Sequence, residues 1–459
     1  MLRLRSNLAL STLALTLTAA PLPAQGRSIP RDYRAAADSL IRAATRDSAA
    51  YRRLGELVDR FGHRLAGSPS LEAAINWILA EMRKDGLSNV RGEPVMVTSW
   101  VRGQESVDLV TPRRTPLRML GLGGSVGTPA DGITARVLVV SSFDELEKHR
   151  AEARGRIVLF DAPFTEYGET RRYRTDGAVA AARAGAVASL IRSVAPFSIR
   201  SPHTGRVSYQ PDVPKIPAAA LSNEDAMMLH RMQDRGDSVV VTLRMQAHEL
   251  PDAQSRNVVA EVVGRVPDEV VVLGGHIDSW DVGQGAMDDG GGSVAAWEAV
   301  RLIHKLGLRP RRTIRVVLWT NEENGVEGGA AYLERHRDSL TSHVMAMESD
   351  GGVFSPRGVL VAGTDQAVNV VRQVGQLLKP IGADRVTKVD SSPEADIEPM
   401  VTLGVPGIGL DVDGSRYFWY HHSDGDTLDK LDPAEMGRCV ALMAVMAYVI
   451  ADLPDRLPS

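Results

Sequence analysis

The chain has 459 residues, of which 44% are hydrophobic and 24% charged, and its formal net charge at pH 7 is -4. This length exceeds the usual size of one hydrophobic core, so we expect two domains. The mild acidity gives no reason to expect a nucleic-acid partner. The single cysteine, Cys439, excludes an internal disulfide, so any metal must be held by nitrogen and oxygen ligands.

The first residues predict an export signal. Arg3 and Arg5 precede the apolar stretch Leu8–Ala20, which is too short to span a bilayer comfortably. Pro21–Ala24 then offers a small residue for cleavage, which places a signal peptide at 1–24; an uncleaved anchor is the alternative. No other segment reads as a membrane span. We therefore expect a secreted or periplasmic protein with no stable membrane span after cleavage.

Two helical segments follow the signal. Tyr33–Arg60 is charged and amphipathic and is predicted to be helix. The pair Ser68–Pro69 is typical of an N-cap followed by the first helical position. Apolar residues between Leu71 and Met82 keep helical spacing, and Gly86 is expected to end this helix. Residues 25–116 should form the N-terminal part of the main domain.

The pattern changes between residues 117 and 245. Short strand-like runs (Ala135–Val140, Ile157–Phe160 and Val239–Leu243) alternate with turns that contain glycine and proline, and a helix is expected at Ala178–Ala188. This favours an inserted β-rich domain over 117–245. The alternative is one large domain, because length alone does not fix the number of domains.

Strands and helices alternate in the remainder, residues 246–459. The expected strands are Val258–Val263, Val270–Leu273, Ile314–Trp319, Val344–Met347, Val359–Ala362 and Val405–Leu410. The expected helices are Ser293–Leu306, Ala367–Leu378 and Ala434–Leu453, the last of which would bury the Cys439 thiol. Near-continuous Val, Ile and Leu runs between helices predict an α/β domain, with a mixed, mostly parallel sheet covered by helices on both faces.

Five polar clusters each follow or closely trail an apolar run. They are Gly275–Asp278, Gly285–Gly290, Glu322–Glu323, Glu348–Asp350 and His421–Ser423. Each cluster taken alone can be explained without a function, as a loop histidine, a solvated glutamate pair or a plain turn. Their conjunction is improbable by chance. Because open α/β sheets gather functional groups beyond the carboxyl ends of their strands, we expect one shared site.

The residue types of these clusters suit a hydrolytic zinc site. Catalytic zinc takes histidine nitrogen and carboxylate oxygen and keeps one position for water. Two metals about 3.5–4 Å apart also need a shared carboxylate. The five side chains that such a pair requires are His276, Asp288, Glu323, Asp350 and His422. Glu322 then remains free to take a proton from metal-bound water, whose pKa a metal lowers to roughly 7.

Several of these runs resemble a known family. The runs that resemble co-catalytic di-zinc exopeptidases, which include secreted aminopeptidases and glutamate carboxypeptidases, are Gly274–Trp280, Gly285–Gly290, Asn321–Glu323 and Met347–Asp350. The ending Tyr417–Ser423 is similar to the plasma glutamate carboxypeptidase branch. The insert resembles a protease-associated domain, with Gly155–Leu159 and Ala181–Ala186 as markers. This resemblance covers nearly the whole mature chain and implies the zinc exopeptidase fold.

The resemblance implies two Zn²⁺ ions per chain and a ligand set. His276 and Asp350 would bind one zinc, and Glu323 and His422 would bind the other. Asp288 would bridge the two ions, with a cis peptide bond after it. Each residue is assigned by its position in the matching runs.

Two further roles come from the same resemblance. Glu322 matches the general base, which deprotonates the bridging water and then protonates the leaving amine. Asp278 matches the carboxylate that orients His276, an arrangement that metal-bound histidines commonly need.

The chain departs from the family pattern at two places. Family members often place a tyrosine before the last ligand histidine, where it stabilises the tetrahedral oxyanion; here His421 occupies that position and Tyr420 comes one earlier. His421 either takes the donor role or packs, and Ser423 favours His422 as the ligand. The loop Ser391–Asp396 carries less glycine than in relatives and should border the substrate pocket, so substrate preference should differ; within it Asp396 either binds a substrate terminus or is a turn carboxylate.

We therefore expect an exported di-zinc exopeptidase that hydrolyses dipeptides or short peptides by attack of a water that bridges both metals. The insert should narrow access, and the resemblance suggests free dipeptides as substrates and a homodimer. A broad aminopeptidase with a more open cleft is the first alternative, since sequence does not give pocket depth. Glutaminyl cyclase has a related fold but one zinc, which the five ligands argue against. A binding or receptor protein on an inactive scaffold is the third, against which the intact Glu322 argues.

Overall fold

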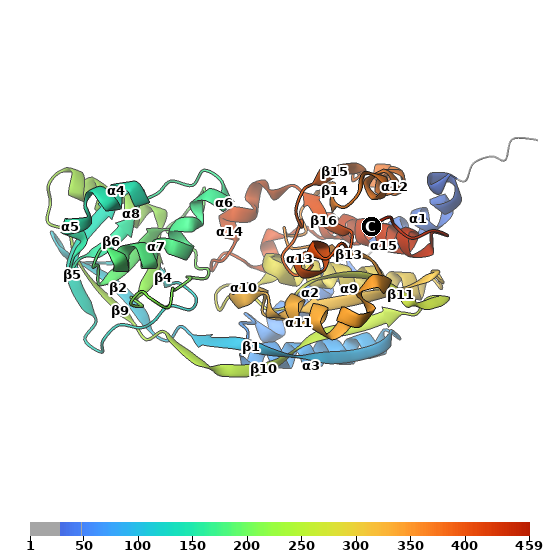
Figure 1. Cartoon of the computed structure of the whole chain (residues 1–459), viewed down its shortest axis with the longest axis horizontal. Coiled ribbons are helices and arrows are strands. Elements are labelled where there is room, and N and C mark those ends of the chain that lie inside the picture. Colours follow the sequence, from blue (N-terminus) through green and yellow to red (C-terminus); the bar gives the residue numbers. More distant parts are fainter. Residues whose placement is uncertain (1–27, 47) are drawn as a thin grey trace, which may run out of the picture.

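The structure is a computed structural model that describes residues 28–46 and 48–459. The export signal expected at 1–24 lies outside the described residues. Two eight-stranded sheets occupy opposite ends of an elongated molecule, and a long ribbon of two strands connects them (Figure 1). The larger domain holds the chain termini that the structure describes, and the smaller one is an insertion within it.

The main sheet has the order β1-β10-β12-β11-β13-β16-β14-β15. Its strands are β1 (Ser88–Val101), β10 (His248–Val262), β11 (Val266–His276), β12 (Arg312–Trp319), β13 (His343–Glu348), β14 (Pro356–Ala362), β15 (Arg385–Val389) and β16 (Gly407–Val412). Four of the seven pairings are parallel (β11 with β12, β11 with β13, β13 with β16, and β14 with β15), which confirms the mixed, mostly parallel sheet.

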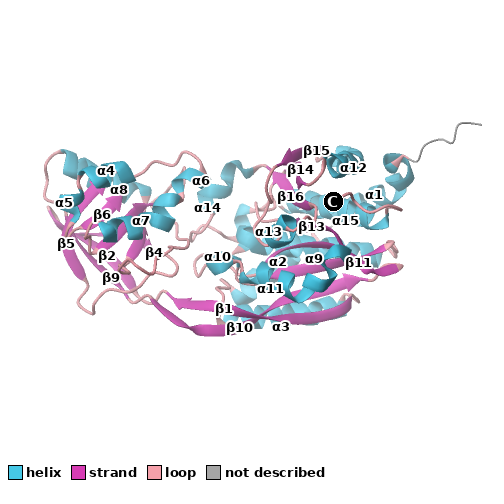
Figure 2. Cartoon of the chain, in the orientation of Figure 1, coloured by secondary structure: helices cyan, strands magenta, loops and turns pink. Residues whose placement is uncertain are grey.

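Helices cover both faces of this sheet, as Figure 2 shows. One face is covered by α1 (Ile29–Arg46), α2 (Ala49–Phe61), α3 (Pro69–Lys84), α9 (Gly291–Lys305), α12 (Asp365–Gly375) and α15 (Pro433–Asp452). The other is covered by α11 (Glu327–His336) and α13 (Glu398–Thr402). Side chains alternate along β12, so Val316 and Leu318 face the first core while Val317 and Trp319 face the second. The α/β fold with helices on both faces is confirmed.

The last helix, α15, is apolar on all sides. Among the described residues it is the one helix long and apolar enough to cross a membrane, and 83% of its most apolar stretch is buried. It packs against α1, α9 and the sheet, which explains why it needs no polar face. Cys439 lies on it as a buried free thiol, as the sequence predicted.

Some elements differ from their predicted limits. The segment Tyr33–Arg60 forms two helices, α1 and α2, because Ser48 interrupts the helical conformation and precedes α2. Ser68 caps α3 as expected, since its hydroxyl accepts the backbone N–H of Leu71 at 3.2 Å. The helix predicted at Ala178–Ala188 spans Arg172–Arg183 instead, as α7, because Gly185 takes a positive φ and ends it.

The second sheet has the order β3-β2-β9-β5-β6-β7-β8-β4. Its strands are β2 (Glu105–Thr111), β3 (Thr115–Leu117), β4 (Met119–Gly121), β5 (Ile133–Val140), β6 (Ile157–Phe160), β7 (Ala188–Arg192), β8 (Ala218–Leu221) and β9 (Val240–Met245). Its helices are α4 (Phe143–Lys148), α5 (Arg150–Ala153), α6 (Tyr167–Thr170), α7 and α8 (Asn223–Asp234). We call residues 105–245 the insert; it begins twelve residues before the expected 117, because β2 pairs with β9.

The insert packs against the main domain on the side of α14 (Tyr417–Tyr420). Trp280 of the main domain lies in the hydrophobic core of the insert, 2% exposed. A Cβ on Gly123 would lie only 2.0 Å from the Trp280 ring, so the close approach requires glycine. Arg102, three residues before the insert, forms an ion pair with Asp281 and donates to the backbone carbonyl oxygen of Gly121 in the insert. These contacts hold the insert over the end of the main sheet.

Candidate functional site

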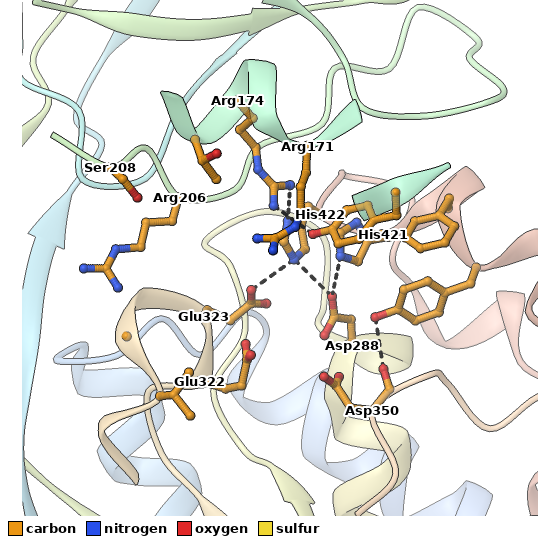
Figure 3. Close-up of a pocket in the computed structure, with 16 residues that line it drawn as sticks. Arg171, Arg174, Arg206, Ser208, Asp288, Glu322, Glu323, Asp350, His421 and His422 are labelled. Carbon is orange, nitrogen blue, oxygen red and sulfur yellow. Dashed lines mark hydrogen bonds and ion pairs between the residues drawn. The ribbon is translucent and has the colours of Figure 1, made fainter. Parts of the chain in front are cut away.

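The polar clusters meet at one edge of the main sheet. His276 is the last residue of β11, Glu322 and Glu323 begin α10 (Glu322–Gly325) just after β12, and Asp350 follows β13. Because β12, β11 and β13 are parallel neighbours, their carboxyl ends lie together. Figure 3 shows the side chains of Glu322, Glu323 and Asp350 converging on one space around Asp288.

His276 forms the first half of the site. Its Nε2 lies 3.1 Å from Asp288 Oδ1 and 3.2 Å from Asp350 Oδ1. The imidazole is completely buried. Its partner atoms lie within 4.8 Å of one another, the spacing of a metal-binding group.

His422 forms the second half. Its Nε2 lies 3.0 Å from Glu323 Oε2 and 3.3 Å from Asp288 Oδ2. The two oxygens of Asp288 therefore face the two histidines separately, the geometry that a shared carboxylate needs. The peptide bond between Asp288 and Asp289 is cis, as the resemblance implied.

His421 also belongs to this group. Its ring stacks on the His422 ring with centroids 3.5 Å apart, and its Nε2 lies 3.6 Å from Asp288 Oδ2. Burial first, and then the neighbouring His422, lowers the pKa of His421 well below its ordinary value. A neutral imidazole therefore faces the site at this position.

Two residues of the insert contact the backbone of His421 and His422. The backbone carbonyl oxygen of His421 lies 2.6 Å from Nδ1 of His203, and the carbonyl of His422 accepts the N–H of Thr204 at 2.9 Å. His203 and Thr204 are both buried residues of the insert. Sequence reasoning missed both, because their partners lie more than 200 positions away.

Carboxylates outside the expected ligand set fix the backbone around it. Asp278 accepts the N–H groups of Glu322 at 3.1 Å and Glu323 at 3.3 Å. Asp289 accepts the N–H of His276 at 3.1 Å. Asp426 accepts the N–H groups of three successive residues, 286–288, at 2.6–3.2 Å. Sequence reasoning assigned a role only to Asp278 among these three.

Arg64 is another residue that the sequence did not reveal. It is fully buried, and its guanidinium donates to the carbonyl oxygens of Ile277, Gln284 and Gly285 at 2.8–2.9 Å. Burial lowers the pKa of Arg64 to about 10, while Asp426 and the neighbouring aspartates act in the opposite direction. Arg64 thus joins the loops that carry the site.

The site has more negative charge than its histidines can balance. Burial first, then Asp350 and Glu323, raises the pKa of Glu322 well above its ordinary value. Burial raises the pKa of Glu323 to about 7, although His422 opposes the shift. Burial alone would lower the pKa of His276, but Asp350 and its other carboxylate partners raise it well above normal. Divalent cations would supply the missing positive charge.

The donor set fits zinc. Zinc prefers histidine nitrogen and carboxylate oxygen, and both are present in each half of the site. Glu323 Oε1 is a buried oxygen with no hydrogen-bond partner, which leaves it available as a ligand atom. His276 Nδ1 lies 3.1 Å from the backbone oxygen of Asp278 and 3.6 Å from its carboxylate, which leaves Nε2 facing the site.

These groups open into a cavity of about 460 Å³. Its floor includes Asp288, Glu322, Glu323, Asp350, His421 and His422, and Tyr417 lines its side. The residues that the insert contributes are Tyr167, Arg171, Arg174, Thr175, Arg206 and Ser208. Sequence reasoning found no functional cluster in the insert; the arginine-rich run that begins at Arg171 is the signal that was present.

The loop Ser391–Asp396 was expected to border the substrate pocket, but none of its residues lines this cavity. Asp396 is completely buried and accepts the N–H of Gly329 at 3.1 Å, as a structural carboxylate does. Burial, and then Asp350 and Glu322, raises the pKa of Glu394 well above its ordinary value. Glu394 therefore lies close enough to Asp350 and Glu322 for their charges to favour its neutral, protonated form.

Comparisons with known proteins agree with this geometry. The sequence matches peptidase family M28 over residues 257–447 and the PA domain over residues 123–229. It is 49% identical to carboxypeptidase Q of Xenopus laevis, over 93% of this chain and 91% of that protein. It is also 49% identical to carboxypeptidase Q of Homo sapiens, over 89% of this chain and 86% of that protein.

Solved structures share the whole architecture. A peptidase M28 precursor from Shewanella amazonensis superposes with a TM-score of 0.90 at 36% identity, over 94% of this chain and 99% of that one. A zinc aminopeptidase from Bacillus subtilis superposes with a TM-score of 0.65 at 18% identity, over 89% of this chain and 98% of that one. The second comparison shows a common fold alone.

Proposed function

The chain belongs to peptidase family M28 and is a metallo-exopeptidase, and on this basis we propose that it hydrolyses free dipeptides or short peptides with two zinc ions bound. The observation that carries the proposal is the position of Glu322, a half-buried carboxylate without a ligand role that lines one cavity together with Asp288, Glu323, Asp350 and His422. The 49% identity to carboxypeptidase Q supports the substrate class.

Each half of the site holds one zinc in this proposal. His276 and Asp350 would hold the first ion and Glu323 and His422 the second, with Asp288, whose two oxygens face the two histidines, shared between them. Bound zinc polarises the scissile carbonyl and lowers the pKa of a coordinated water to roughly 7. Asp278 acts as a positioning residue, because it holds the backbone of Glu323 and lies beside the His276 ring.

Glu322 moves the proton. It accepts a proton from the attacking water while the water oxygen bonds to the carbonyl carbon of the substrate. When the C–N bond breaks, Glu322 returns that proton to the leaving amine nitrogen. The backbone N–H of Glu322 bonds to Asp278 Oδ1, which fixes the start of α10 and hence the direction of this side chain.

His421 is the proposed donor to the tetrahedral oxyanion. It is neutral, buried and 3.6 Å from the shared carboxylate, so its Nε2 can carry the proton that a donor needs. Tyr417 also lines the cavity, but its hydroxyl donates to the backbone oxygen of Asp350 at 3.1 Å. Replacement of His421 by phenylalanine should therefore lower kcat more than replacement of Tyr417.

Export and self-association complete the proposal. Two features support a secreted or periplasmic location. One is the signal-like segment at residues 1–24, and the other is the resemblance to a family with secreted members. A homodimer is suggested by the resemblance alone, and native mass spectrometry of the mature chain tests it.

The experiment is a matched peptide set, incubated with the zinc-loaded protein and read by mass spectrometry. The set contains free dipeptides, longer peptides, and versions blocked at either end, with Glu322→Gln protein as the control. Cleavage of free dipeptides that the control lacks supports the proposal. Stepwise trimming of long peptides from the amino end would replace it with a broad aminopeptidase. No cleavage at all would favour a binding or receptor protein.

A further inference from the structure

Val326 has a backbone conformation that its own side chain disfavours. Its φ is 59° and its ψ 27°, which lie in the left-handed helical region. Five described residues other than glycine have a positive φ, and Val326 is the one β-branched residue among them. A side chain branched at Cβ is crowded by the backbone in this region, whereas glycine adopts it freely. Strained residues of this kind persist mainly at functional sites, so the valine needs an explanation.

The fold needs a left-handed residue at this position, but it does not need a valine. The N–H of Val326 donates to the carbonyl oxygen of Glu322 at 3.1 Å, and its own carbonyl oxygen accepts the N–H of Ala330 at 3.2 Å. Glycine would make both bonds without strain. Asn321, the left-handed residue at the other end of α10, belongs to a type that tolerates this region, and its amide donates to the Glu327 carboxylate. A valine side chain can make no such bond.

The hydrophobic cores do not compensate for the strain either. Val326 is half-buried, and in the described chain it is neither a member of a core cluster nor one of the partly buried residues packed against a cluster. It lines the cavity instead, together with Gly325 and Glu322. Most residues that line this cavity are polar or charged, so the isopropyl group forms an apolar spot on its wall. A strained apolar group that faces a cavity is retained where a ligand packs against it.

The position of Val326 relative to Glu322 indicates which part of a substrate it meets. The two residues are four positions apart on one helical turn, so their side chains lie on the same side of that turn. In the proposed reaction Glu322 returns a proton to the leaving amine nitrogen, so its carboxylate lies beside that nitrogen. The side chain nearest to this nitrogen is that of the amino acid that leaves. In a dipeptide this is the C-terminal residue.

We propose that Val326 is a specificity-determining residue that packs against the side chain of the leaving amino acid, an inference that rests on the proposed exopeptidase function. The isopropyl group favours substrates whose leaving amino acid is apolar, because the contact removes apolar surface of both groups from water. The strain results from placing a β-branched residue at a left-handed position. Glycine at position 326 should therefore stabilise the fold and weaken the preference for apolar substrates.

Urea denaturation of the zinc-loaded protein tests the strain. Val326→Gly should lower the equilibrium constant for unfolding roughly 3- to 10-fold, because the relief of strain exceeds the effect of the flexibility that glycine adds to the unfolded chain. The matched control is Val263→Gly, since Val263 is 46% exposed, follows β10 and has no positive φ. This control should raise the constant, as glycine does at an ordinary position. Val326→Ile keeps the branched side chain and should match the wild type.

Two dipeptides that differ only in the leaving amino acid, Ala-Leu and Ala-Gly, test the contact. The wild-type protein should have the higher kcat/KM for Ala-Leu. Val326→Gly should lower kcat/KM for Ala-Leu roughly 4- to 20-fold and change kcat/KM for Ala-Gly by less than about 2-fold. Val326→Ile should keep the preference for Ala-Leu, and Val263→Gly should change neither value.

Two results would overturn the proposal while leaving the exopeptidase function intact. One is an equal fall in kcat/KM for both dipeptides on Val326→Gly, which would mean that Val326 only positions α10. The other is a Val326→Gly protein that is no more stable than the wild type, which would show that the valine is not strained.

A binding measurement decides the matter if the wild type cleaves neither dipeptide, in which case the proposed function fails. Calorimetric titration of the zinc-loaded protein then compares Ala-Leu with Ala-Gly. Tighter binding of Ala-Leu that is lost in Val326→Gly would support the contact. Equal binding of the two dipeptides by the wild type would overturn it.

Discussion

Asp278 joins Glu322 to the histidine at the end of β11. Its Oδ1 accepts the N–H of Glu322 at 3.1 Å and lies 3.6 Å from His276 Nδ1, while its Oδ2 accepts the N–H of Glu323 at 3.3 Å. The carboxylate is completely buried. The Asp278 side chain therefore positions the proposed base Glu322, the proposed ligand Glu323 and the imidazole ring of the proposed ligand His276.

Replacement of Glu322 by glutamine should remove the proton acceptor and leave the fold intact. General base catalysis contributes roughly 10²- to 10⁴-fold, so we expect kcat for a free dipeptide to fall by at least about 100-fold. Glu322 is not a proposed ligand, so zinc content should stay the same. Steady-state kinetics and elemental analysis on one preparation check this; a variant that retains activity would exclude Glu322 as the base.

Replacement of Asp278 by asparagine should weaken zinc binding. The asparagine amide cannot accept both N–H groups of α10, and it orients the His276 ring less firmly. Loss of such supporting carboxylates typically lowers metal affinity 10- to 100-fold. Competition with a chromophoric chelator measures the affinity, with the exposed Asp268→Asn as control. Equal affinities for the two variants would contradict the positioning role.

Wild-type protein should bind two zinc ions per chain, and Asp288→Asn should bind fewer. Asp288 directs one oxygen toward each histidine, so a neutral amide in its place weakens both halves of the site. Native mass spectrometry counts the ions. Zinc bound to the folded state also stabilises it by mass action, so removal with a chelator should lower Tm. A single ion in the wild type would reject the two-metal site.

The sequence was sufficient to predict the floor of the site. Buried runs such as Ile314–Trp319 mark central strands, and the polar residues that follow a parallel strand must lie at the same edge as those that follow its neighbours. His276, Glu323 and Asp350 could be placed together for this reason. The same regularity predicted the mixed sheet and its covering helices.

The sequence was not sufficient for contacts between the domains. Arg174 and His422 are 248 positions apart, and nothing in the pattern around either residue indicates the other. The strand β1 was also missed. Only part of one of its faces is buried, so the alternation of apolar and polar residues is weak, and its long pairing with β10 joins residues far apart in the sequence. Arg64 gave no signal, since its partners are backbone carbonyls, which no side-chain motif encodes.

Replacement of Arg64 by methionine should destabilise the fold. The change leaves buried carbonyl oxygens of the loops that carry the site without donors, at a cost of about 1–3 kcal/mol for each unsatisfied group. We expect the free energy of unfolding to fall by at least about 3 kcal/mol. Urea denaturation of zinc-loaded protein measures it. Arg60→Met, which removes an exposed arginine paired with Glu56, is the control and should change stability by less than about 1 kcal/mol.

Acid should destabilise the protein through His343, far from the metal site. His343 is 4% exposed, with Nε2 3.0 Å from the Tyr332 hydroxyl and Nδ1 3.2 Å from the Ser339 carbonyl oxygen. Burial lowers the pKa of His343 to about 4 from 6.5, although the hydrogen bond to Ser339 opposes the shift. Between these values the unfolded chain binds more protons than the folded chain. Stability is therefore present above pH 6.5 and is lost as the pH falls toward 4.

The size of this loss follows from the two pKa values. Between pH 7 and pH 5 it amounts to about 2 kcal/mol, since one pKa unit corresponds to about 1.4 kcal/mol. Glutamine at 343 cannot be protonated, so His343→Gln should lose less stability than the wild type over this range, by about that amount. Urea denaturation of both proteins at the two pH values measures the difference, and the exposed His248→Gln should follow the wild type. Parallel pH profiles for the wild type and His343→Gln would show that His343 does not remain neutral in the folded chain.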